Sequence, residues 1–276
     1  MAINLAPNNP YALTLATPVI AAAGCFGYGV EYARSVAIER MGAIVTRTTT
    51  LLPQRPGRAP RIIETAAGVL CVGPWPNPGI ETVLARHTPR WAEWRTPIIL
   101  SIGGESAGEY GQLAGAIEGV EGIAGLEMVL PPEAGRAVAI VLAVRRATPL
   151  PLLAKLPLLE TAALVMLANA LAEAGADALT LFAPPIGTQI DPVSGEQATG
   201  WLCGPAVLPL TLRALVEVAP QITLPIIACG GIASAAHAQQ AMVAGAQAVQ
   251  IGAALLANPH LVGKIGAEST TADERR

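Results

Sequence analysis

Eight short apolar runs alternate with Ala- and Leu-rich stretches along the whole chain, and this alternation limits the folds open to the sequence. The runs show no regular polar face, which is typical of parallel strands that are covered on both sides. They lie at 17–24, 43–49, 97–103, 125–130, 151–156, 178–182, 225–231 and 248–253. Eight strand–helix units predict a single α/β domain, a (β/α)8 TIM barrel over residues 1–265. A doubly wound parallel sheet is the alternative.

The stretches between the runs have helical patterns, for example at 160–175 and 234–246. In AEAGADALTL (172–181) and again in MVAGAQAVQI (242–251), a glycine separates the helical pattern from the next run. Glycine in this place commonly ends a helix in the left-handed conformation. The N-terminal dozen residues are expected to form a hairpin that closes the bottom of the barrel. Residues 266–276 have the composition of a disordered tail.

Two connections are too long to be ordinary loops. One follows the second run, at 51–79, and the other follows the sixth, at 183–205. Loops that follow barrel strands lie on the C-terminal face, where barrel active sites are built, and long loops there are usually functional. The segment 191–195, Asp-Pro-Val-Ser-Gly, predicts a hairpin turn inside the second connection.

Composition excludes several classes of protein. Hydrophobic residues make up 52% of the chain, charged residues 13%, and mean hydropathy is +0.49, values that raise the question of a membrane protein. The longest uncharged segment, 218–263, is interrupted by Pro and Gly, so no apolar stretch of about 20 residues exists. The N-terminus shows no signal-peptide pattern, and we expect a cytoplasmic protein. A net charge of −3 without a basic block argues against nucleic-acid binding. So few charges suggest that a second copy covers part of the surface, in a homodimer.

The cysteines and histidines predict no metal site. The four cysteines lie far apart, and no C-x-x-C pair occurs. Cys25 directly follows the first run and is the best-placed thiol, although small buried cysteines are common. The three histidines are interpreted as surface residues, at positions 87, 237 and 260.

Pairs of small residues end the last two runs. Gly230-Gly231 ends the seventh run and Gly252-Ala253 the eighth, and each pair opens a helical stretch. Small residues let the backbone approach a phosphate closely, and a helix N-terminus offers free amides. Barrels often bind phosphate at this place, so the pattern predicts a phosphate site. The alternative is that the glycines only permit tight turns.

Three polar side chains stand out at the ends of runs or in the long connections. Lys155 interrupts the apolar run PLLAKLP, and because a lone buried ammonium is costly, it must face the barrel mouth or pair with an acid. The same argument applies to Arg47 in TRTTT. Asn77, in PNPG, is either a site residue or a plain turn residue.

Together these segments resemble the class 1 dihydroorotate dehydrogenases, most closely the 1B type. The matching segments run in order along nearly the whole chain: AAGCFGYGVEYA, TRTTTLLP, APRIIETAAGVL, PNPGIE, LLAKLP, EAGADALTL, GPAVLP, and IIACGGI with AGAQAVQIGAALL. The resemblance implies a barrel that holds FMN at the strand C-termini. It implies oxidation of dihydroorotate to orotate in pyrimidine biosynthesis, and a partner subunit that carries FAD and an iron–sulfur cluster.

The resemblance also assigns a cofactor site. Ala23 and Gly24 match positions under the flavin ring, and Lys155 matches the lysine that supports the electron-rich edge of the reduced flavin. The cofactor-binding residues that it implies are Ala23, Gly24, Arg47, Thr48, Lys155, Gly204, Gly230, Gly231, Gly252 and Ala253. It implies a substrate-binding role for Arg47 and Asn77.

The substrate site departs from the family's pattern at the fourth run. There the family has Asn-x-Ser-Cys-Pro-Asn, whose cysteine removes a proton from dihydroorotate, but positions 129–134 read Val-Leu-Pro-Pro-Glu-Ala. The asparagine expected after the sixth run is Ala183. No catalytic residue is assigned, and Glu133 and Cys25 are the candidates for a replacement base. An FMN oxidoreductase with another substrate, a non-catalytic structural or regulatory subunit, and a flavin-free isomerase or synthase for a phosphorylated substrate therefore stay as alternatives.

Overall fold

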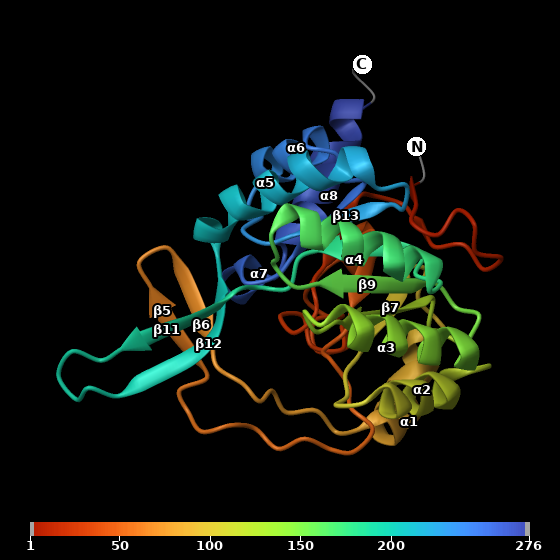
Figure 1. Cartoon of the computed structure of the whole chain (residues 1–276), viewed down its shortest axis with the longest axis horizontal. Helices are drawn as coiled ribbons and strands as arrows, with labels where there is room; N and C mark the ends of the chain where they lie inside the picture. The colour runs from red at the N-terminus through yellow and green to blue at the C-terminus, as the bar shows by residue number, and fades with distance from the viewer. Residues whose placement is uncertain (1–2, 274–276) are drawn as a thin grey trace.

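Eight parallel strands close into a barrel, in the order β10-β13-β14-β3-β4-β7-β8-β9 (Figure 1). The computed structural model describes residues 3–273, with side chains to residue 268. The barrel strands are β3 (Val19–Ala21), β4 (Ala43–Val45), β7 (Ile98–Ile102), β8 (Gly125–Val129), β9 (Leu152–Leu156), β10 (Ala178–Leu181), β13 (Ile226–Cys229) and β14 (Ala248–Ile251). Each lies within one of the eight predicted runs, so the TIM barrel is confirmed and the doubly wound alternative is wrong.

Helices surround the barrel. The crossovers between strands contain α1 (Ile80–Trp91), α2 (Ala107–Ile117), α3 (Ala134–Ala147), α4 (Thr161–Glu173), α5 (Leu208–Val218) and α6 (Ala235–Val243). The last strand, β14, is followed by α7 (Ala254–Ala257) and α8 (Leu261–Asp273). The first crossover differs from the predicted strand–helix unit. Between β3 and β4 the chain makes turns and one short 3-10 helix, Ile38–Arg40. Glycines with positive φ, Gly24, Gly27 and Gly29, explain why no α-helix forms in the first half of this segment.

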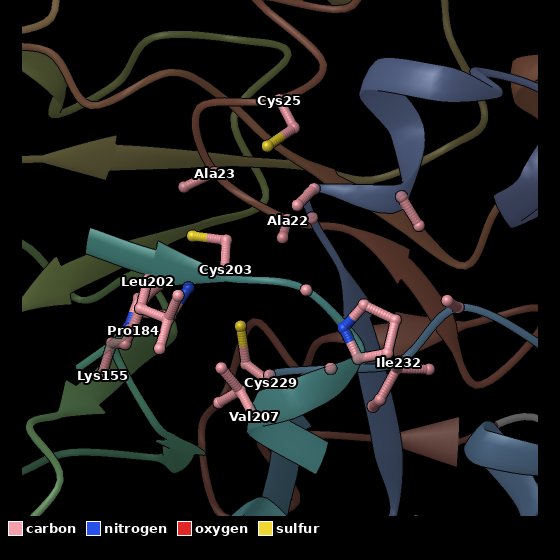
Figure 2. A pocket seen from close by; sticks show the side chains of 18 residues that line it. Ala22, Ala23, Cys25, Lys155, Pro184, Leu202, Cys203, Val207, Cys229 and Ile232 are labelled. Carbon is pink, nitrogen blue, oxygen red and sulfur yellow. The ribbon is translucent and has the colours of Figure 1, made fainter. Parts of the chain in front are cut away.

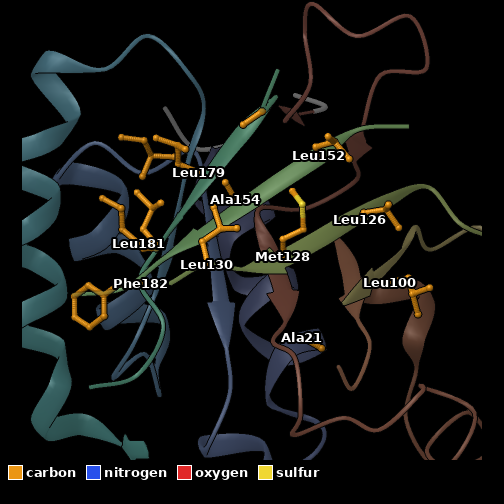
Figure 3. Packing of buried hydrophobic residues seen from close by; sticks show 14 of the residues in the cluster. Ala21, Leu100, Leu126, Met128, Leu130, Leu152, Ala154, Leu179, Leu181 and Phe182 are labelled. Atoms are coloured by element: carbon orange, nitrogen blue, oxygen red, sulfur yellow. The ribbon is translucent and has the colours of Figure 1, made fainter. Parts of the chain in front are cut away.

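Successive residues of the barrel strands alternate between two environments, as strand geometry requires. On β9, Leu152 and Ala154 face the helices, whereas Leu153 lies in the barrel interior. Figure 3 shows this outer layer for several neighbouring strands, with Leu126, Met128, Leu179 and Leu181 among the side chains between sheet and helices. Both faces of these strands are therefore buried, which explains their continuous apolar sequence.

The two long connections join into a sheet of their own. Its strands are β5 (Ile62–Thr65), β6 (Gly68–Cys71), β11 (Ile186–Ile190) and β12 (Gln197–Cys203), hydrogen-bonded in the order β11-β12-β6-β5. The sheet projects from the barrel, on the left in Figure 1. The hairpin turn expected at 191–195 joins β11 to β12 and is confirmed, since Asp191 Oδ1 accepts from the amides of Val193 and Ser194. The pairing of the two connections was not predicted.

The N-terminal segment closes the lower end of the barrel, as expected. β1 (Ile3–Asn4) and β2 (Thr14–Leu15) pair antiparallel, and Leu5, Leu13 and Leu15 belong to the interior hydrophobic cluster of the barrel. At the other end of the chain, the boundary expected between barrel and tail falls inside α8, and 274–276 lie outside the described residues. None of the helices in the described part of the chain has the length and apolar character needed to cross a membrane.

Candidate functional site

A layer of polar side chains lies inside the barrel, near the carboxyl ends of four strands. Glu127, Lys155, Thr180 and Gln250 occupy the interior positions of β8, β9, β10 and β14, because their sequence neighbours face the helices. All four are buried. A polar group in such a position must be hydrogen-bonded inside the protein, since water cannot replace a missing partner.

The layer satisfies its own hydrogen bonds. Lys155 Nζ donates to Glu127 Oε1 at 3.1 Å and to Gln250 Oε1 at 2.8 Å. The second carboxylate oxygen of Glu127 accepts from Gln250 Nε2 and from Thr180 Oγ1. Sequence reasoning predicted that Lys155 would face the barrel mouth or pair with an acid, and it does both. It missed Glu127, although an acid inside the apolar run GLEMVL carries the same signal as a lysine inside PLLAKLP.

Lys155 stays protonated in this setting. Burial alone lowers the pKa of its ammonium, but Cys229 and the Glu127 carboxylate raise it more, and the pKa lies above its usual value. The result is a fixed positive charge whose side chain also lines a cavity above the layer. A cation held rigidly by two acceptors can stabilise negative charge on a ligand that contacts it.

The cavity opens at the carboxyl ends of the strands (Figure 2). It contains seven of the predicted cofactor residues: Ala23, Lys155, Gly204, Gly230, Gly231, Gly252 and Ala253. Gly24, Arg47, Thr48 and Asn77 are not among its lining residues. The structure therefore brings together residues predicted at the ends of the first, fifth, seventh and eighth runs and in the connection after the sixth. The residues predicted at the end of the second run do not line the cavity.

Glycine is required at three cavity positions by the protein's own backbone. Gly204, Gly230 and Gly231 have φ of +126°, +132° and +75°. A Cβ at Gly231 would overlap the backbone nitrogen of Leu208, and one at Gly204 would lie 2.5 Å from Gly68 Cα. At these three positions, tight turns of the backbone are sufficient to explain the glycines, as in the alternative to a phosphate site.

Gly252 is different. Its φ lies outside the left-handed region, and an added Cβ would meet Ala22 Cβ at 3.6 Å and Cys25 Sγ at 3.8 Å, which is ordinary contact. Neither conformation nor packing therefore requires glycine here, while the missing side chain leaves room in the cavity. In the described part of the chain, the amides of Gly231, Gly252 and Ala253 also have no acceptor. Free amides beside an open backbone suit an anionic group such as a phosphate.

Arg47 and Thr48 lie beside the cavity, at the end of β4. Arg47 Nη1 donates to Pro76 O at 3.3 Å, but its buried Nε has no acceptor within the described residues. A buried donor without a partner is uncommon and costs about 1–3 kcal/mol. Thr48 Oγ1 shares a 2.9 Å hydrogen bond with Ser101 Oγ. Arg47 thus has an unused donor for a ligand, whereas Thr48 is occupied.

Asn77 is occupied by the loop that contains it. Its Oδ1 accepts from the amides of Thr50 and Gly79 and from Thr50 Oγ1, at 3.0–3.2 Å, and its Nδ2 donates to Gln54. These contacts hold the start of the long connection against the N-terminus of α1. Of the two roles that the sequence allowed, the geometry favours the turn residue.

The loop after β8 brings no acid or base to the cavity. It runs from Leu130, which is buried, through Pro131 and Pro132 to the exposed Glu133 at the start of α3. Cys25 does line the cavity, but burial, with smaller contributions from Cys71 and Cys229, raises the pKa of its thiol to about 12. A thiol that stays protonated at neutral pH cannot take up a proton, so neither candidate is placed to act as the base.

The barrel offers free backbone amides after β13 and β14, with the buried Lys155 nearby. These features define a class of barrel protein whose C-terminal face is suited to binding a phosphorylated ligand. A family model described as dihydroorotate dehydrogenase matches residues 8–270. The chain belongs to the dihydroorotate dehydrogenase family.

Its relatives are named as catalytic subunits. The chain is 39% identical to the dihydroorotate dehydrogenase B (NAD(+)) catalytic subunit of Desulforudis audaxviator, over 93% of this chain and 88% of the relative. It is also 39% identical to the protein of the same name from Pelobacter propionicus, over 94% and 88%. The crystal structure of DHODH from Eimeria tenella in complex with ferulenol is similar in fold, with a TM-score of 0.78 at 19% identity over 99% of this chain and 84% of the other. The resemblance to the 1B type is thereby confirmed.

Proposed function

We propose that this chain is an FMN-binding oxidoreductase subunit that retains its cofactor site but does not turn over dihydroorotate at an appreciable rate. The observation that carries the cofactor part of this proposal is Gly252, a glycine that neither its φ nor its packing requires, in a cavity with free amides. The second half rests on the loop after β8, which offers no base.

The residues present fit FMN. The amides of Gly231, Gly252 and Ala253 would hold the phosphate, and Ala23 would leave space for the flat ring. The Lys155 ammonium would support the edge of the ring that becomes electron-rich on reduction, and Glu127 and Gln250 would keep it in place. When bound, FMN supplies the hydride-accepting chemistry of the family.

Dihydroorotate oxidation needs a base and hydrogen-bond partners for a charged substrate. Loss of a positioned base costs roughly 10²–10⁴ in rate. Each missing partner of a charged group costs about another 1.5–3 kcal/mol. Val129, Pro132, Ala134 and Ala183 cannot supply either function. A more apolar substrate is favoured instead, because Pro184, Leu202 and Ile232 line the cavity.

The names of the relatives support the presence of a partner subunit beside this chain. They are called catalytic subunits, and NAD(+) appears in those names, which supports an electron-transfer subunit carrying FAD and an iron–sulfur cluster beside this chain. We also propose a homodimer, for which the low fraction of charged residues is the ground, and a cytoplasmic location.

Two measurements on the purified chain test the two halves separately. FMN is expected to bind, with quenching of flavin fluorescence, and dithionite is expected to bleach the bound flavin. Anaerobic mixing with excess dihydroorotate is expected to leave the visible absorbance almost unchanged over minutes. Bleaching by dihydroorotate within seconds would contradict the second half, and failure to bind FMN would contradict the first.

A further inference from the structure

All four cysteines of the chain meet around the cavity, although they are widely separated in the sequence. Cys25, Cys203 and Cys229 line it, after β3, at the end of β12 and at the end of β13 (Figure 2). Cys71, at the end of β6, lies diagonally across from Cys203 at the end of β12. Neither the proposed function nor the polar layer explains why these residues are thiols.

The sheet register places Cys71 and Cys203 on the same face. Trp201 pairs with Cys71 and Cys203 pairs with Val69, so the two cysteines are diagonal neighbours on adjacent antiparallel strands. Ordinary diagonal neighbours are about 7–8 Å apart, slightly too far for a disulfide, which needs Cα atoms within about 7 Å. A bridge here therefore requires the strands to approach more closely than usual.

Glycines allow this close approach beside both cysteines. A Cβ at Gly200 would overlap the carbonyl oxygen of Cys71, and a Cβ at Gly68 would overlap that of Cys203. The two backbones thus touch at places where any other residue would push them apart. The two thiols also lie close enough to shift each other's pKa.

The thiols differ in reactivity. The neighbouring Cys203 thiol lowers the pKa of Cys71, although burial opposes the effect. The Cys71 thiol, together with burial, raises the pKa of Cys203. Because the thiolate is the nucleophile, Cys71 is the attacking group and Cys203 the resolving group.

We propose that Cys71 and Cys203 form a redox-active dithiol, which hydrogen peroxide oxidises to a disulfide that ties β6 to β12 at the cavity wall. A small oxidant fits the site because Cys71 is only 6% exposed, so a bulky disulfide could not reach it.

The reaction has two steps. The Cys71 thiolate attacks one oxygen of hydrogen peroxide, the O–O bond breaks, and a sulfenic acid forms while hydroxide leaves and is protonated to water. Cys203 then attacks Cys71 Sγ, the S–O bond breaks, the S–S bond forms, and the leaving hydroxide takes the Cys203 proton as a second water. In total, two thiols and one peroxide give one disulfide and two waters.

The bridge has a direct structural consequence. Cys203 is followed by Gly204, which lines the cavity, and Gly68, three residues before Cys71, lies against Gly204. Oxidation would fix this part of the wall covalently, and reduction would release it.

The sequence makes the test unambiguous, because trypsin places each cysteine on a different peptide: 1–34, 62–86, 156–213 and 214–264. The reduced full-length chain is treated with a small excess of hydrogen peroxide, its remaining thiols are alkylated, and the digest is analysed by mass spectrometry without reduction. We expect the four free thiols to fall to two, with one bridged product joining 62–86 to 156–213 within a single chain.

Single variants separate the two roles. Cys203→Ser should lose the bridge and accumulate oxidised Cys71, whereas Cys71→Ser should lose the bridge and leave Cys203 as a thiol. Cys229→Ser is the matched control, since it removes another thiol of the cavity and should leave the bridge intact. A bridge that joins 1–34 or 214–264 to another peptide, a bridge between chains, or four intact thiols in the folded protein would overturn the proposal.

Discussion

Replacing Lys155 by Met tests whether the polar layer is truly sealed from water. The side chains of Lys155 and Glu127 are 5% and 0% exposed, so solvent cannot screen the carboxylate once its cation is gone. Breaking a buried pair by removing one partner typically costs about 3–5 kcal/mol. Glu127 keeps the hydrogen bonds from Thr180 and Gln250, which places the expected loss near the lower end, about 3 kcal/mol.

For a chain of this length, about 3 kcal/mol corresponds to a fall in Tm on the order of 10 °C.

Thermal unfolding followed by circular dichroism measures this fall. The double variant Lys155→Met with Glu127→Gln is the matched control, because it removes the carboxylate charge while keeping its shape. It should recover most of the lost Tm. Equal Tm values for the single and double variants would refute the reasoning, since they would mean that water reaches the carboxylate.

Two further substitutions separate residues that hold the fold from residues that serve a ligand. Gly231→Ala should lower the free energy of unfolding by more than the ~1–2 kcal/mol that a left-handed non-glycine residue costs, because the new Cβ would overlap Leu208. Gly252→Ala should keep the urea midpoint and weaken FMN binding by roughly tenfold, about 1.4 kcal/mol. An unchanged FMN affinity in Gly252→Ala would contradict the ligand role. Asn77→Ala removes three accepted hydrogen bonds and should cost about 1–3 kcal/mol in urea unfolding, with no change in FMN affinity, and an unchanged midpoint would show that the loop does not depend on it.

The barrel was predictable because the sequence of each strand indicates that the strand is buried. Both faces of each strand are covered, so a continuous apolar run is the whole signal, and it is local in sequence. The pairing of β6 with β12 gives no comparable signal. It joins residues that are far apart in the sequence, and nothing in 62–71 taken alone specifies 197–203 as its partner.

The candidate site was predictable where glycine or a charge interrupts an apolar pattern. Lys155 and Gly252 were found in this way. Asn77 shows the limit, because a turn residue and a substrate ligand have the same sequence signature and only its hydrogen bonds distinguish them. The convergence of the four cysteines was missed for a different reason: spacing along the chain says nothing about side chains that meet across a barrel mouth.

The second sheet also has a mechanical consequence. In the closed order of strands, β4 and β10 lie on opposite sides of the barrel, and the connections that follow them form the two hairpins of this sheet. The sheet therefore acts as a clasp between two half-barrels, one containing β13, β14 and β3, the other β7, β8 and β9. Opening the barrel between these halves requires the clasp to separate as well. Because its pairing closes a long loop of chain, the clasp should form late in folding, after the barrel has brought its two ends together.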